Sequence, residues 1–407
     1  MNMIEIEQAQ AAVLSRAKPR PAELRPLCQA LGCVLAEEII SDIDSPPYDK
    51  ALMDGYAVIA SDLRGGRGAL MVVDEVMAGD IPCEPLQSGM ATRVMTGAPV
   101  PRGADTVVVQ ERSRMDTSGE IPTVQIEDPG VRPGQNILYR GMSLQRGQTV
   151  LRIGRKITAI DAGLLAEVGR GQVLVHPPPR VAVLATGNEL VPPGEMPGPG
   201  QIRNSNGPML CGLVRSAGGQ PVELGIARDT EAALSHQMNQ GFREDALVLC
   251  GGVSTGTLDL VPRVLRDLGV EQVFHGVRLK PGKPMWFGTL PHARGTRLVF
   301  GLPGNPVSAL VCFELFVRPA IAALSGHSPE VFSSVTGELT ESYRQRGDRP
   351  TYFPVQLERQ GDRALVRLLD WQGSADLKTL TLAAGLAVFP AGSTVFEPGE
   401  SVSVLLL

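Results

Sequence analysis

The sequence of 407 residues has few aromatic side chains and no excess of positive charge. Aromatic residues make up 4% of the chain, too few for the stacked rings with which single-strand nucleic-acid binders hold bases. Lysine and arginine number 38 against 43 aspartate and glutamate residues, and the resulting net charge of −5 disfavours general nucleic-acid binding. A small anionic ligand would therefore need a local cluster of cations.

Paired cysteines and long apolar runs are absent as well. The six cysteines form no C-x-x-C pair and have no nearby histidine pair, which argues against a zinc site and fits a reducing compartment. The start of the chain lacks the basic and apolar segments of a signal peptide, and no run of 18 apolar residues occurs. We expect a soluble cytoplasmic protein that binds no membrane. The scattered histidines indicate no Ser/His or Cys/His nucleophile.

Glycine and proline, by contrast, are abundant. The 46 glycines and 33 prolines predict many turns and short strands, and at roughly 150 residues per domain the length allows two to four domains. Changes of pattern predict a multi-domain α/β plus all-β fold with four parts. We expect a mixed α/β N-terminal domain (1–45 and 141–176), an inserted β-rich domain (46–140), a central α/β domain (177–328) and a small C-terminal β-barrel (329–407).

The first 176 residues mix helical and extended patterns. The expected elements of the N-terminal domain are helices at 4–15, 22–31 and 159–168, with an extended segment at 34–40. In the inserted domain, short β-branched runs between Gly and Pro turns predict strands at 70–76, 106–110 and 123–126. No convincing helix falls within that domain.

After a stiff connector, Pro177 to Pro179, strands and helices alternate. The expected strands are 181–185, 222–226, 246–250, 272–274 and 298–300, and the expected helices are 208–217, 231–239, 260–268 and 307–324. Almost wholly apolar strands that alternate with helices are typical of a parallel sheet covered on both faces. Ligands of such sheets bind at the carboxyl ends of the strands.

Four polar clusters follow these strands, at 186–189, 228–230, 251–259 and 301–306. In the third cluster Gly251, Gly252 and Gly256 can turn backbone amides inward, Ser254 and Thr255 add hydroxyls, and a helix follows. This pattern predicts a phosphate cradle. A tight turn between strand and helix would explain any one such cluster equally well, but the expected convergence of four favours a functional site.

Charged residues near these clusters extend the hypothesis. Lys280 and Lys283 stand on a Pro-restricted segment and are suited to oxyanions, although a solvated turn fits the same pattern. Glu189, Asp229 and Asp259 beside a phosphate suggest a bridging Mg²⁺. The competing reading of Asp229 and Asp259 is helix capping.

Two further segments of the inserted domain stand out, 53–57 and 96–103, and both also fit ordinary turns and loops. Together with the motifs above they resemble the molybdopterin molybdenumtransferase family, which includes bacterial MoeA and the E domain of gephyrin. Six motifs in the family's order carry the resemblance over almost the whole chain: 53–58, 96–105, 186–190, 251–256, 280–284 and 301–309.

This resemblance implies an elongated homodimer whose active site lies between the α/β domain and parts of the partner subunit. It also implies that adenylylated molybdopterin and molybdate are the substrates, and that molybdenum cofactor and AMP are released with the help of Mg²⁺. The implied protein partners are the molybdopterin adenylyltransferase and proteins of molybdoenzyme maturation.

The resemblance also assigns roles to residues. Glu189, Asp229 and Asp259 are expected to act at the metal and the diphosphate, Lys280 and Lys283 to neutralise oxyanions, and Asp54 with Thr96 to reach a site shared with the second subunit. The remaining expected binding residues are Gly252, Ser254 and Thr255 at the phosphate, Pro303, Asn305 and Ser308 on the molybdate side, and, by looser correspondence, Arg349 and Ser374.

The chain departs from the family pattern at a few positions. Leu138 and Ser143 stand where the family commonly has a basic and an acidic residue, and Arg140 is a candidate to replace the lost cation. Ala51 replaces a serine before Asp54. These departures keep one alternative open, a non-catalytic molybdopterin-binding or scaffold protein. A second alternative, a nucleotide hydrolase unrelated to molybdenum, is one that the α/β segment alone would permit. The choice between molybdate and tungstate also stays open.

Overall fold

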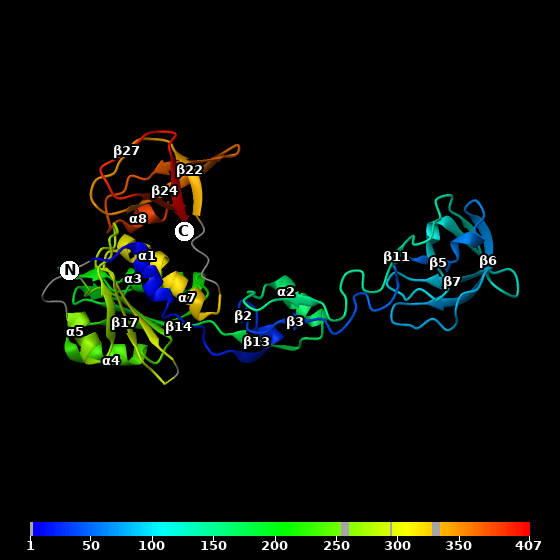
Figure 1. The fold of residues 1–407 in the computed structure, drawn as a ribbon, viewed down its shortest axis with the longest axis horizontal. Coiled ribbons are helices and arrows are strands. Elements are labelled where there is room, and N and C mark those ends of the chain that lie inside the picture. Colours follow the sequence, from blue (N-terminus) through cyan, green and yellow to red (C-terminus); the bar gives the residue numbers. More distant parts are fainter. Residues whose placement is uncertain (1–2, 254–259, 294, 328–333) are drawn as a thin grey trace. The chain divides into compact units, whose positions relative to one another are not determined.

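The computed structural model describes residues 3–253, 260–293, 295–327 and 334–407, which fold into two compact units. Unit 1 comprises Met1–Glu37, Ile153–Ile160 and Gln172–Leu407. Unit 2 comprises Glu38–Arg152 and Asp161–Gly171, so it is inserted into the sequence of unit 1 (Figure 1). The expected fold class, α/β with an inserted β-rich part and a C-terminal barrel, is confirmed. The boundaries of the four predicted domains stay a prediction.

The α/β part of unit 1 contains a six-stranded sheet. Its strand order is β17 (Gln220–Ala227), β14 (Arg180–Thr186), β18 (Ala246–Cys250), β21 (Arg297–Leu302), β20 (Trp286–Leu290) and β19 (Glu271–His275). The first four are parallel, whereas β20 is antiparallel to both of its neighbours. Strand β20 was not predicted, because Gly288 interrupts its apolar run. A Cβ there would lie 2.7 Å from the carbonyl oxygen of Glu271.

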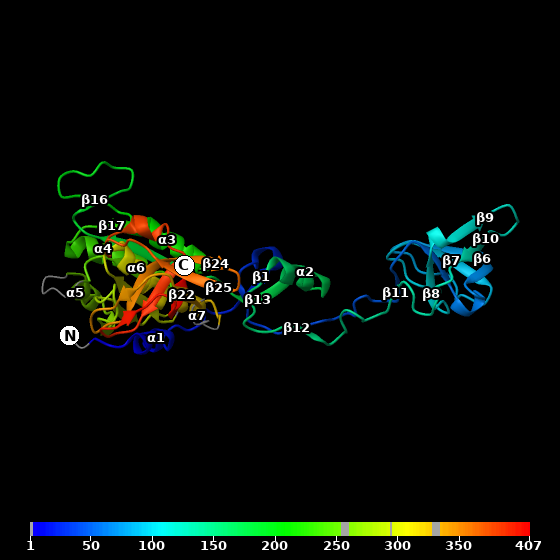
Figure 2. The same cartoon turned by 90° about the horizontal axis from the view of Figure 1, so that it is seen from above.

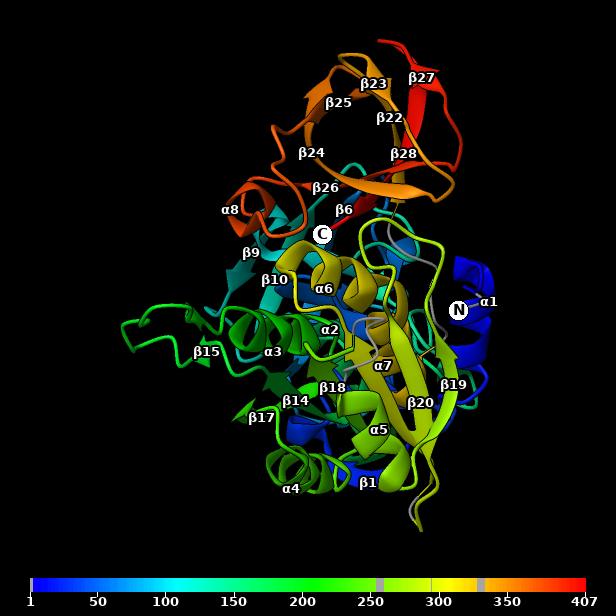
Figure 3. The ribbon, with the colours of Figure 1, turned by 90° about the vertical axis from the view of Figure 1, so that its left-hand side faces the viewer.

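Helices cover both faces of this sheet, as Figure 3 shows. They are α3 (Asn206–Ser216), α4 (Glu231–Gly241), α5 (Leu260–Asp267), α6 (Pro306–Cys312), η4 (Phe313–Val317, a π-helix) and α7 (Arg318–Leu324), together with the N-terminal α1 (Ile6–Leu14). Val181 and Val183 of β14 join the core beneath α1, α3 and α6–α7, whereas Ala182 and Leu184 join the core beneath α4 and α5. This alternation is the two-residue period of a strand buried on both faces.

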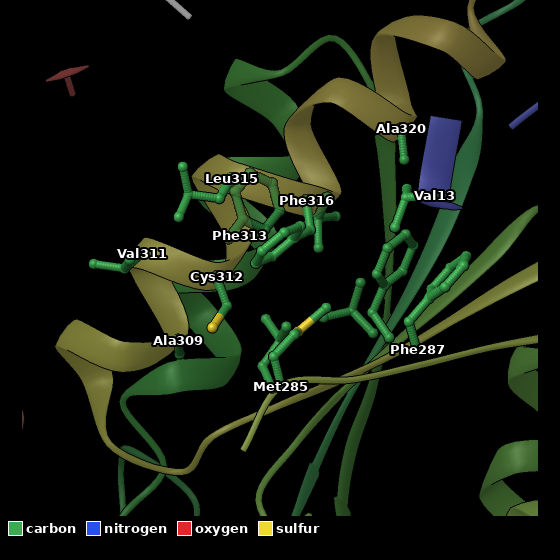
Figure 4. Packing of buried hydrophobic residues seen from close by; sticks show 14 of the residues in the cluster. Val13, Met285, Phe287, Ala309, Val311, Cys312, Phe313, Leu315, Phe316 and Ala320 are labelled. Carbon is green, nitrogen blue, oxygen red and sulfur yellow. The ribbon is translucent and has the colours of Figure 1, made fainter. Parts of the chain in front are cut away.

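The core beneath α6–α7 is rich in aromatic side chains. Figure 4 shows Phe313 and Phe316 packed towards Met285 and Phe287, with Val13 of α1 alongside. The segment Pro306–Leu324 has the length and composition of a membrane-crossing helix, but 83% of its apolar window is buried inside the protein. We therefore assign it as a core helix of the α/β part.

One prediction for the N-terminal residues is wrong. The helix predicted at 22–31 is instead strand β1 (Glu23–Pro26) followed by the short helix η1 (Leu27–Gln29). Strand β1 pairs with β13 (Gln172–His176), which also pairs with β2 (Val34–Leu35). Pro26 interrupts helical hydrogen bonding, so pairing with β13 prevails over the local pattern. The helix predicted at 159–168 is confirmed as α2 (Ala159–Glu167).

The remaining structure is mostly β. In unit 2 a six-stranded sheet has the order β8 (Thr106–Val109), β5 (Gly55–Val58), β7 (Met90–Val94), β6 (Arg67–Val76), β10 (Thr123–Glu127) and β9 (Ser113–Asp116). Short pairs join β3 (Ile39–Ile40) to β12 (Thr149–Leu151) and β4 (Lys50–Ala51) to β11 (Ile137–Leu138), and two short helices are η2 (Ala60–Asp62) and η3 (Gln110–Arg112).

At the end of unit 1 a closed barrel is formed by β22 (Ser334–Leu339), β25 (Arg363–Leu368), β24 (Thr351–Gln360), β26 (Gly385–Phe389) and β28 (Ser401–Leu406). It is accompanied by β23 (Tyr343–Arg344), α8 (Leu377–Leu380) and β27 (Val395–Phe396). In the α/β part, β15 (Leu190–Val191) and β16 (Ile202–Arg203) bound a loop that stands out from the core in Figure 2.

Candidate active site

A cavity of about 580 Å³ lies at the carboxyl ends of the parallel strands in unit 1. Its wall contains residues that follow β14, β17, β18 and β21, and the first residues of α3 and α6. The four polar clusters therefore converge at one edge, as the strand alternation predicts. Five of the predicted site residues line this cavity: Glu189, Asp229, Gly252, Pro303 and Asn305.

Gly251 and Gly252 form the turn that leaves β18 and enters the cavity wall. Both have positive φ, 101° and 64° respectively, a region that residues with a side chain rarely adopt. A Cβ on Gly251 would lie 2.5 Å from the carbonyl oxygen of Thr186, and one on Gly252 would lie 2.6 Å from the side chain of Val261. Both positions therefore require glycine, which lets the backbone itself line the cavity.

Glu189 and Asp229, the two acidic residues of the cavity wall, belong to two loops that are joined by hydrogen bonds. The Asn188 N–H donates to Asp229 Oδ2 at 3.2 Å, and the Asp229 N–H donates to Asn188 Oδ1 at 3.1 Å. The carboxylate of Glu189 folds back over Gly187, where a Cβ would lie 2.8 Å from its carboxyl carbon. Helix α4 is capped by Thr230, whose hydroxyl accepts from Ala233 N–H. The capping role considered for Asp229 thus belongs to its neighbour.

Two helix N-termini also reach the cavity. Asn204 Oδ1 accepts a hydrogen bond from the Gly207 N–H at 2.9 Å at the start of α3, and Asn305 immediately precedes Pro306 at the start of α6. Helix N-termini carry partial positive charge, so both favour an anionic ligand. Helix α3 was not part of the predicted cradle.

Lys280 and Lys283 are exposed on the loop between β19 and β20. The main chain of Lys280 is fixed by the barrel, since its N–H donates to Pro350 O at 2.9 Å and its carbonyl accepts from Tyr352 N–H at 2.8 Å. Arg349 Nη1 donates to Leu279 O at 3.1 Å, so it supports the same loop. Neither lysine is among the described lining residues of the cavity, but Pro284 of this loop is.

The barrel also supplies residues at the cavity. Asn305 Nδ2 donates to Ser374 Oγ at 2.9 Å, and the Val307 N–H donates to the Ser374 carbonyl at 3.0 Å. Ala375 lines the cavity next to them. Ser308 is only 5% exposed within α6 and is not among the described residues of the cavity wall. Ser374 therefore contacts the cavity wall through its hydrogen bond with Asn305.

Cys250, the last residue of β18, contributes a buried thiol to the wall. Its Sγ donates to the Pro303 carbonyl at 3.4 Å. Burial raises the pKa of Cys250 to about 12. The thiol is therefore protonated at neutral pH and serves as a structural donor at this site.

Three predicted residues, Ser254, Thr255 and Asp259, lie outside the described residues. Within 3–253, 260–293, 295–327 and 334–407, no group of three His, Cys, Asp or Glu side chains is placed to hold a metal ion. Glu189 and Asp229 nonetheless provide two carboxylates at one cavity. Carboxylates combined with phosphate oxygens are a ligand set that suits Mg²⁺.

Asp54 and Thr96 come together in unit 2. The Thr96 N–H and hydroxyl both donate to Asp54 Oδ1, at 2.7 and 2.6 Å. The hydroxyl bond, followed by the backbone bond, holds the pKa of Asp54 below its ordinary value. Asp54, directly before β5, is therefore a carboxylate that is held in place and kept ionised by Thr96.

The positions that depart from the family pattern also lie in unit 2. Arg140 Nε donates to Asp44 Oδ2 at 2.7 Å, and the Arg140 N–H donates to Asp49 Oδ1 at 2.9 Å. Ser143 is exposed and its N–H donates to the Ser45 carbonyl at 3.0 Å. The Arg140 guanidinium, which was the candidate to replace the lost cation, therefore forms an ion pair with Asp44.

Sequence reasoning missed four polar residues of the cavity wall, Arg203, Asn204, Ser205 and Asn206. Arg203 Nε donates to the Glu195 carbonyl at 3.0 Å, and its side chain gives the cavity a lining cation. These four residues form the polar run 203–206, which leads into α3 and was a readable signal for an N-terminal ligand site.

Comparison with known proteins agrees with this geometry. Residues 4–169 match the family described as "MoeA N-terminal region (domain I and II)", residues 182–323 the "Probable molybdopterin binding domain" and residues 336–407 the "MoeA C-terminal region (domain IV)". The molybdopterin molybdenumtransferase of Nostoc sp. is 34% identical over 394 residues, covering 95% of this chain and 88% of the relative. The chain belongs to the molybdopterin molybdenumtransferase family.

Other relatives and solved structures agree with this family. The molybdopterin molybdenumtransferase of Staphylococcus aureus is 30% identical and aligns with 100% of this chain and 96% of its own length. The crystal structure of a molybdopterin biosynthesis MoeA protein from Pyrococcus horikoshii matches with a TM-score of 0.83 and 32% identity, covering 100% of this chain and 99% of that one. A second MoeA structure from the same organism gives 0.79 and 29%, with both chains fully covered. The chain is thus a transferase-family member of molybdenum cofactor biosynthesis.

Proposed function

We propose that this protein inserts molybdenum into adenylylated molybdopterin and releases AMP in a Mg²⁺-dependent reaction. The observation that carries the proposal is that Glu189 and Asp229 line the same cavity as the glycine turn of Gly251 and Gly252. A diphosphate-linked substrate is the class of ligand that needs both backbone amides and a cation-binding pair of carboxylates.

The phosphate groups are expected to bind at the glycine turn. Gly251 and Gly252 bring the backbone to the cavity surface without a Cβ, and α3 and α6 point their N-termini at the same space. Arg203 adds a formal positive charge to the wall. These groups would favour the dianionic substrate despite the net negative charge of the chain.

The carboxylates Glu189 and Asp229 are proposed to hold Mg²⁺, with Asp259 as a third candidate ligand. The reciprocal hydrogen bonds between Asn188 and Asp229 orient the latter, because they fix both the loop and one carboxylate oxygen. A bound Mg²⁺ would act as a Lewis acid on the diphosphate oxygens. The role of the protein is to position the carboxylates and to exclude competing geometries.

The oxyanions are proposed to be neutralised by Lys280 and Lys283. Both side chains are long and exposed, and their loop is fixed at the cavity edge by the barrel segment that contains Arg349. On the molybdate side, Pro303 and Asn305 line the cavity, with Ser308 and Ser374 as supporting residues. This arrangement supports catalysis by charge neutralisation and positioning, without a covalent protein intermediate.

We further propose a homodimer in which Asp54 and Thr96 complete the site of the partner subunit. Exposed apolar side chains support an intersubunit surface in unit 2: Leu52, Met53, Tyr139 and Met142 are 45%, 46%, 47% and 69% exposed. Sedimentation of the purified protein as a monomer at micromolar concentration would contradict this part of the proposal. The adenylyltransferase that makes the substrate and proteins of molybdoenzyme maturation are the proposed partners, and cytoplasm the proposed location.

The decisive experiment supplies purified protein with adenylylated molybdopterin, Mg²⁺ and molybdate, and measures AMP. Molybdate-dependent AMP release supports the transferase, binding without release supports the carrier or scaffold alternative, and release without molybdate supports a plain hydrolase. A parallel reaction with tungstate tests metal selectivity.

Site variants then test the assigned residues. Glu189→Gln and Asp259→Asn are expected to abolish AMP release while circular dichroism is unchanged, because each loses a metal-binding charge. Glu195→Gln, on the loop between β15 and β16, is the matched control and should retain turnover. Unchanged turnover of Glu189→Gln would remove that residue from the mechanism.

A further inference from the structure

Two buried polar atoms of residues in the cavity wall have no hydrogen-bond partner among the described residues, Thr186 Oγ1 and Asn206 Oδ1. Thr186 is 3% exposed and ends β14, and Asn206 is the first residue of α3. Buried polar atoms are normally paired, because leaving one unpaired costs its full desolvation. Two of them at one cavity indicate that a ligand supplies the missing partners.

The orientation of the Asn206 amide is fixed by its surroundings. Its Nδ2 donates to the Gly304 carbonyl at 2.6 Å and to Cys250 Sγ at 3.1 Å. The opposite orientation would place Oδ1 against the Gly304 carbonyl oxygen, so two acceptors would repel each other. Both amide hydrogens are therefore used within the protein, and only the acceptor oxygen is left for a ligand.

The Thr186 hydroxyl lies directly beneath the glycine turn. Its Oγ1 is 3.1 Å from the position that a Cβ would occupy on either Gly251 or Gly252. The hydroxyl can rotate, and it can accept a hydrogen bond as well as donate one. Together with Asn206 Oδ1 it gives the residues of the cavity wall two acceptors that have no partner among the described residues, separate from the backbone of the turn.

The chemistry of this wall excludes a phosphate as the partner of Asn206. Phosphate oxygens of a diphosphate ester carry no hydrogen at neutral pH, so they would repel Oδ1. An N–H group of a planar heterocycle is a suitable donor, and an adenylylated pterin carries such groups at both ends. The inference rests on the proposed function, since that supplies this class of ligand.

We propose that Asn206 Oδ1 and the Thr186 hydroxyl form an acceptor subsite that recognises an N–H donor on a heterocycle of the substrate. The donor is either the amino-pyrimidinone edge of the pterin or the amino group of the adenine. Asn206 and Thr186 are thus specificity-determining residues, separate from the carboxylates and the glycine turn. The subsite contributes to binding of the heterocycle and not to binding of the phosphate.

The test measures Kd by calorimetry for three probes, molybdopterin, AMP and ribose 5-phosphate, with wild type, Thr186→Val and Asn206→Ala. Loss of one hydrogen bond is expected to weaken binding about two- to tenfold. Weaker binding of molybdopterin alone assigns the subsite to the pterin, and weaker binding of AMP alone assigns it to the adenine. Ribose 5-phosphate has no heterocycle and should keep its wild-type Kd in both variants.

Inosine monophosphate refines the adenine outcome, because it carries a carbonyl where AMP has its amino group. If adenine is the donor, wild type should bind AMP more tightly than inosine monophosphate, and both variants should lose that preference. Unchanged Kd values for molybdopterin and AMP, or an equal loss for ribose 5-phosphate, would overturn the proposal.

Thr186→Val distinguishes a loss of ligand binding from a loss of stability. Its hydroxyl has no partner among the described residues, so the valine is not expected to lower the unfolding midpoint, and Thr186→Ser should restore binding. Asn239→Ala, which removes an exposed asparagine on α4, controls for truncation. If wild type binds a probe through Thr186 but releases no AMP with molybdate, the proposed reaction fails while the subsite stands.

Discussion

At the scale of single residues, Gly251 shows why backbone conformation matters at the site. Its φ is 101°, and an added Cβ would meet the Thr186 carbonyl oxygen at 2.5 Å. Gly218, at the end of α3, also has a positive φ, 87°, but a Cβ there would meet nothing within 4 Å. The two glycines share the conformational requirement and differ only in the available space.

Gly251→Ala is therefore expected to weaken ligand binding strongly and to destabilise the α/β part by more than Gly218→Ala, for which backbone strain alone costs about 1–2 kcal/mol. The measurements are urea unfolding and the Kd for AMP. Equal destabilisation by both substitutions would mean that the turn relaxes away from β14 and does not depend on the close approach.

The Asp54–Thr96 pair predicts a dependence on pH. Because the folded pKa of Asp54 is below its ordinary value, the pair stabilises the fold above about pH 4, and this contribution is lost as the pH falls through the folded pKa. Thr96→Val removes the hydroxyl bond, keeps the backbone bond, and should raise the pKa of Asp54.

Carboxyl-carbon NMR titration of Asp54 measures this change. Thr96→Ser is the matched control and should keep the low pKa, since it retains the hydroxyl. The stability difference between wild type and Thr96→Val should be present at pH 7 and vanish in strong acid. A difference that grows on acidification would contradict the assignment.

At the scale of elements, the segment from α6 to α7 contains an ion pair whose carboxylate is buried and whose guanidinium is partly exposed. Glu314 of the π-helix has a side chain 3% exposed and forms a hydrogen-bonded pair with Arg318, one bond measuring 2.8 Å. Hydrogen bonding to Glu314 raises the pKa of Arg318. The Gln10 side chain of α1 donates to the Leu315 carbonyl at 3.2 Å within the π-helical stretch.

Removing one partner of this pair should be costly, because the other charge would be left buried. Arg318→Met is expected to destabilise the protein by about 3–5 kcal/mol. The double variant Glu314→Gln with Arg318→Met should recover most of the loss, since no unpaired charge then remains. A double variant as unstable as the single one in urea unfolding would show that packing, not charge, causes the effect.

The comparison of predicted and observed elements follows the same physics. Most strands and helices of 181–324 were predictable because apolar runs of the right length have a clear period. The helix predicted at 22–31 is wrong, since pairing of β1 with β13 joins residues that are far apart in the sequence. The π-helix was not predictable, because its local pattern is that of an ordinary helix.

At the scale of the whole molecule, the cysteines give a direct test of the fold. All six are free thiols, and only Cys28 and Cys83 are exposed. Burial raises the pKa of the other four, Cys33, Cys211, Cys250 and Cys312. Thiolates are the reactive form, so burial and raised pKa both slow modification.

We expect about two thiols to react rapidly with Ellman's reagent in the native protein at pH 8, and six after denaturation. Cys28→Ser with Cys83→Ser should abolish the fast phase and leave unfolding unchanged. Rapid reaction of a third thiol in that double variant would mean that a core region opens under native conditions.

Part of the candidate site was predictable from the sequence. The convergence of Glu189, Asp229, Gly252, Pro303 and Asn305 at one cavity was predictable, because parallel strands bring their carboxyl ends to one edge. Asn206 and Arg203 were not found, since the run that carries them follows the loop between β15 and β16 and no strand of the large sheet. The catalytic and binding roles of the five converging residues stay predictions, as do those of Asp54, Ser254, Thr255 and Asp259.

The sequence by itself indicated the fold class, because alternating apolar strands and helices have a clear period, and its six ordered motifs carried the resemblance to the family. Only the tertiary structure decided that Asn206 meets Gly304 and Cys250, that Ser374 meets Asn305, and that β20 runs antiparallel to its neighbours. The physical reason is that such contacts join residues far apart in the chain. They depend on strand order and packing, which no local pattern encodes.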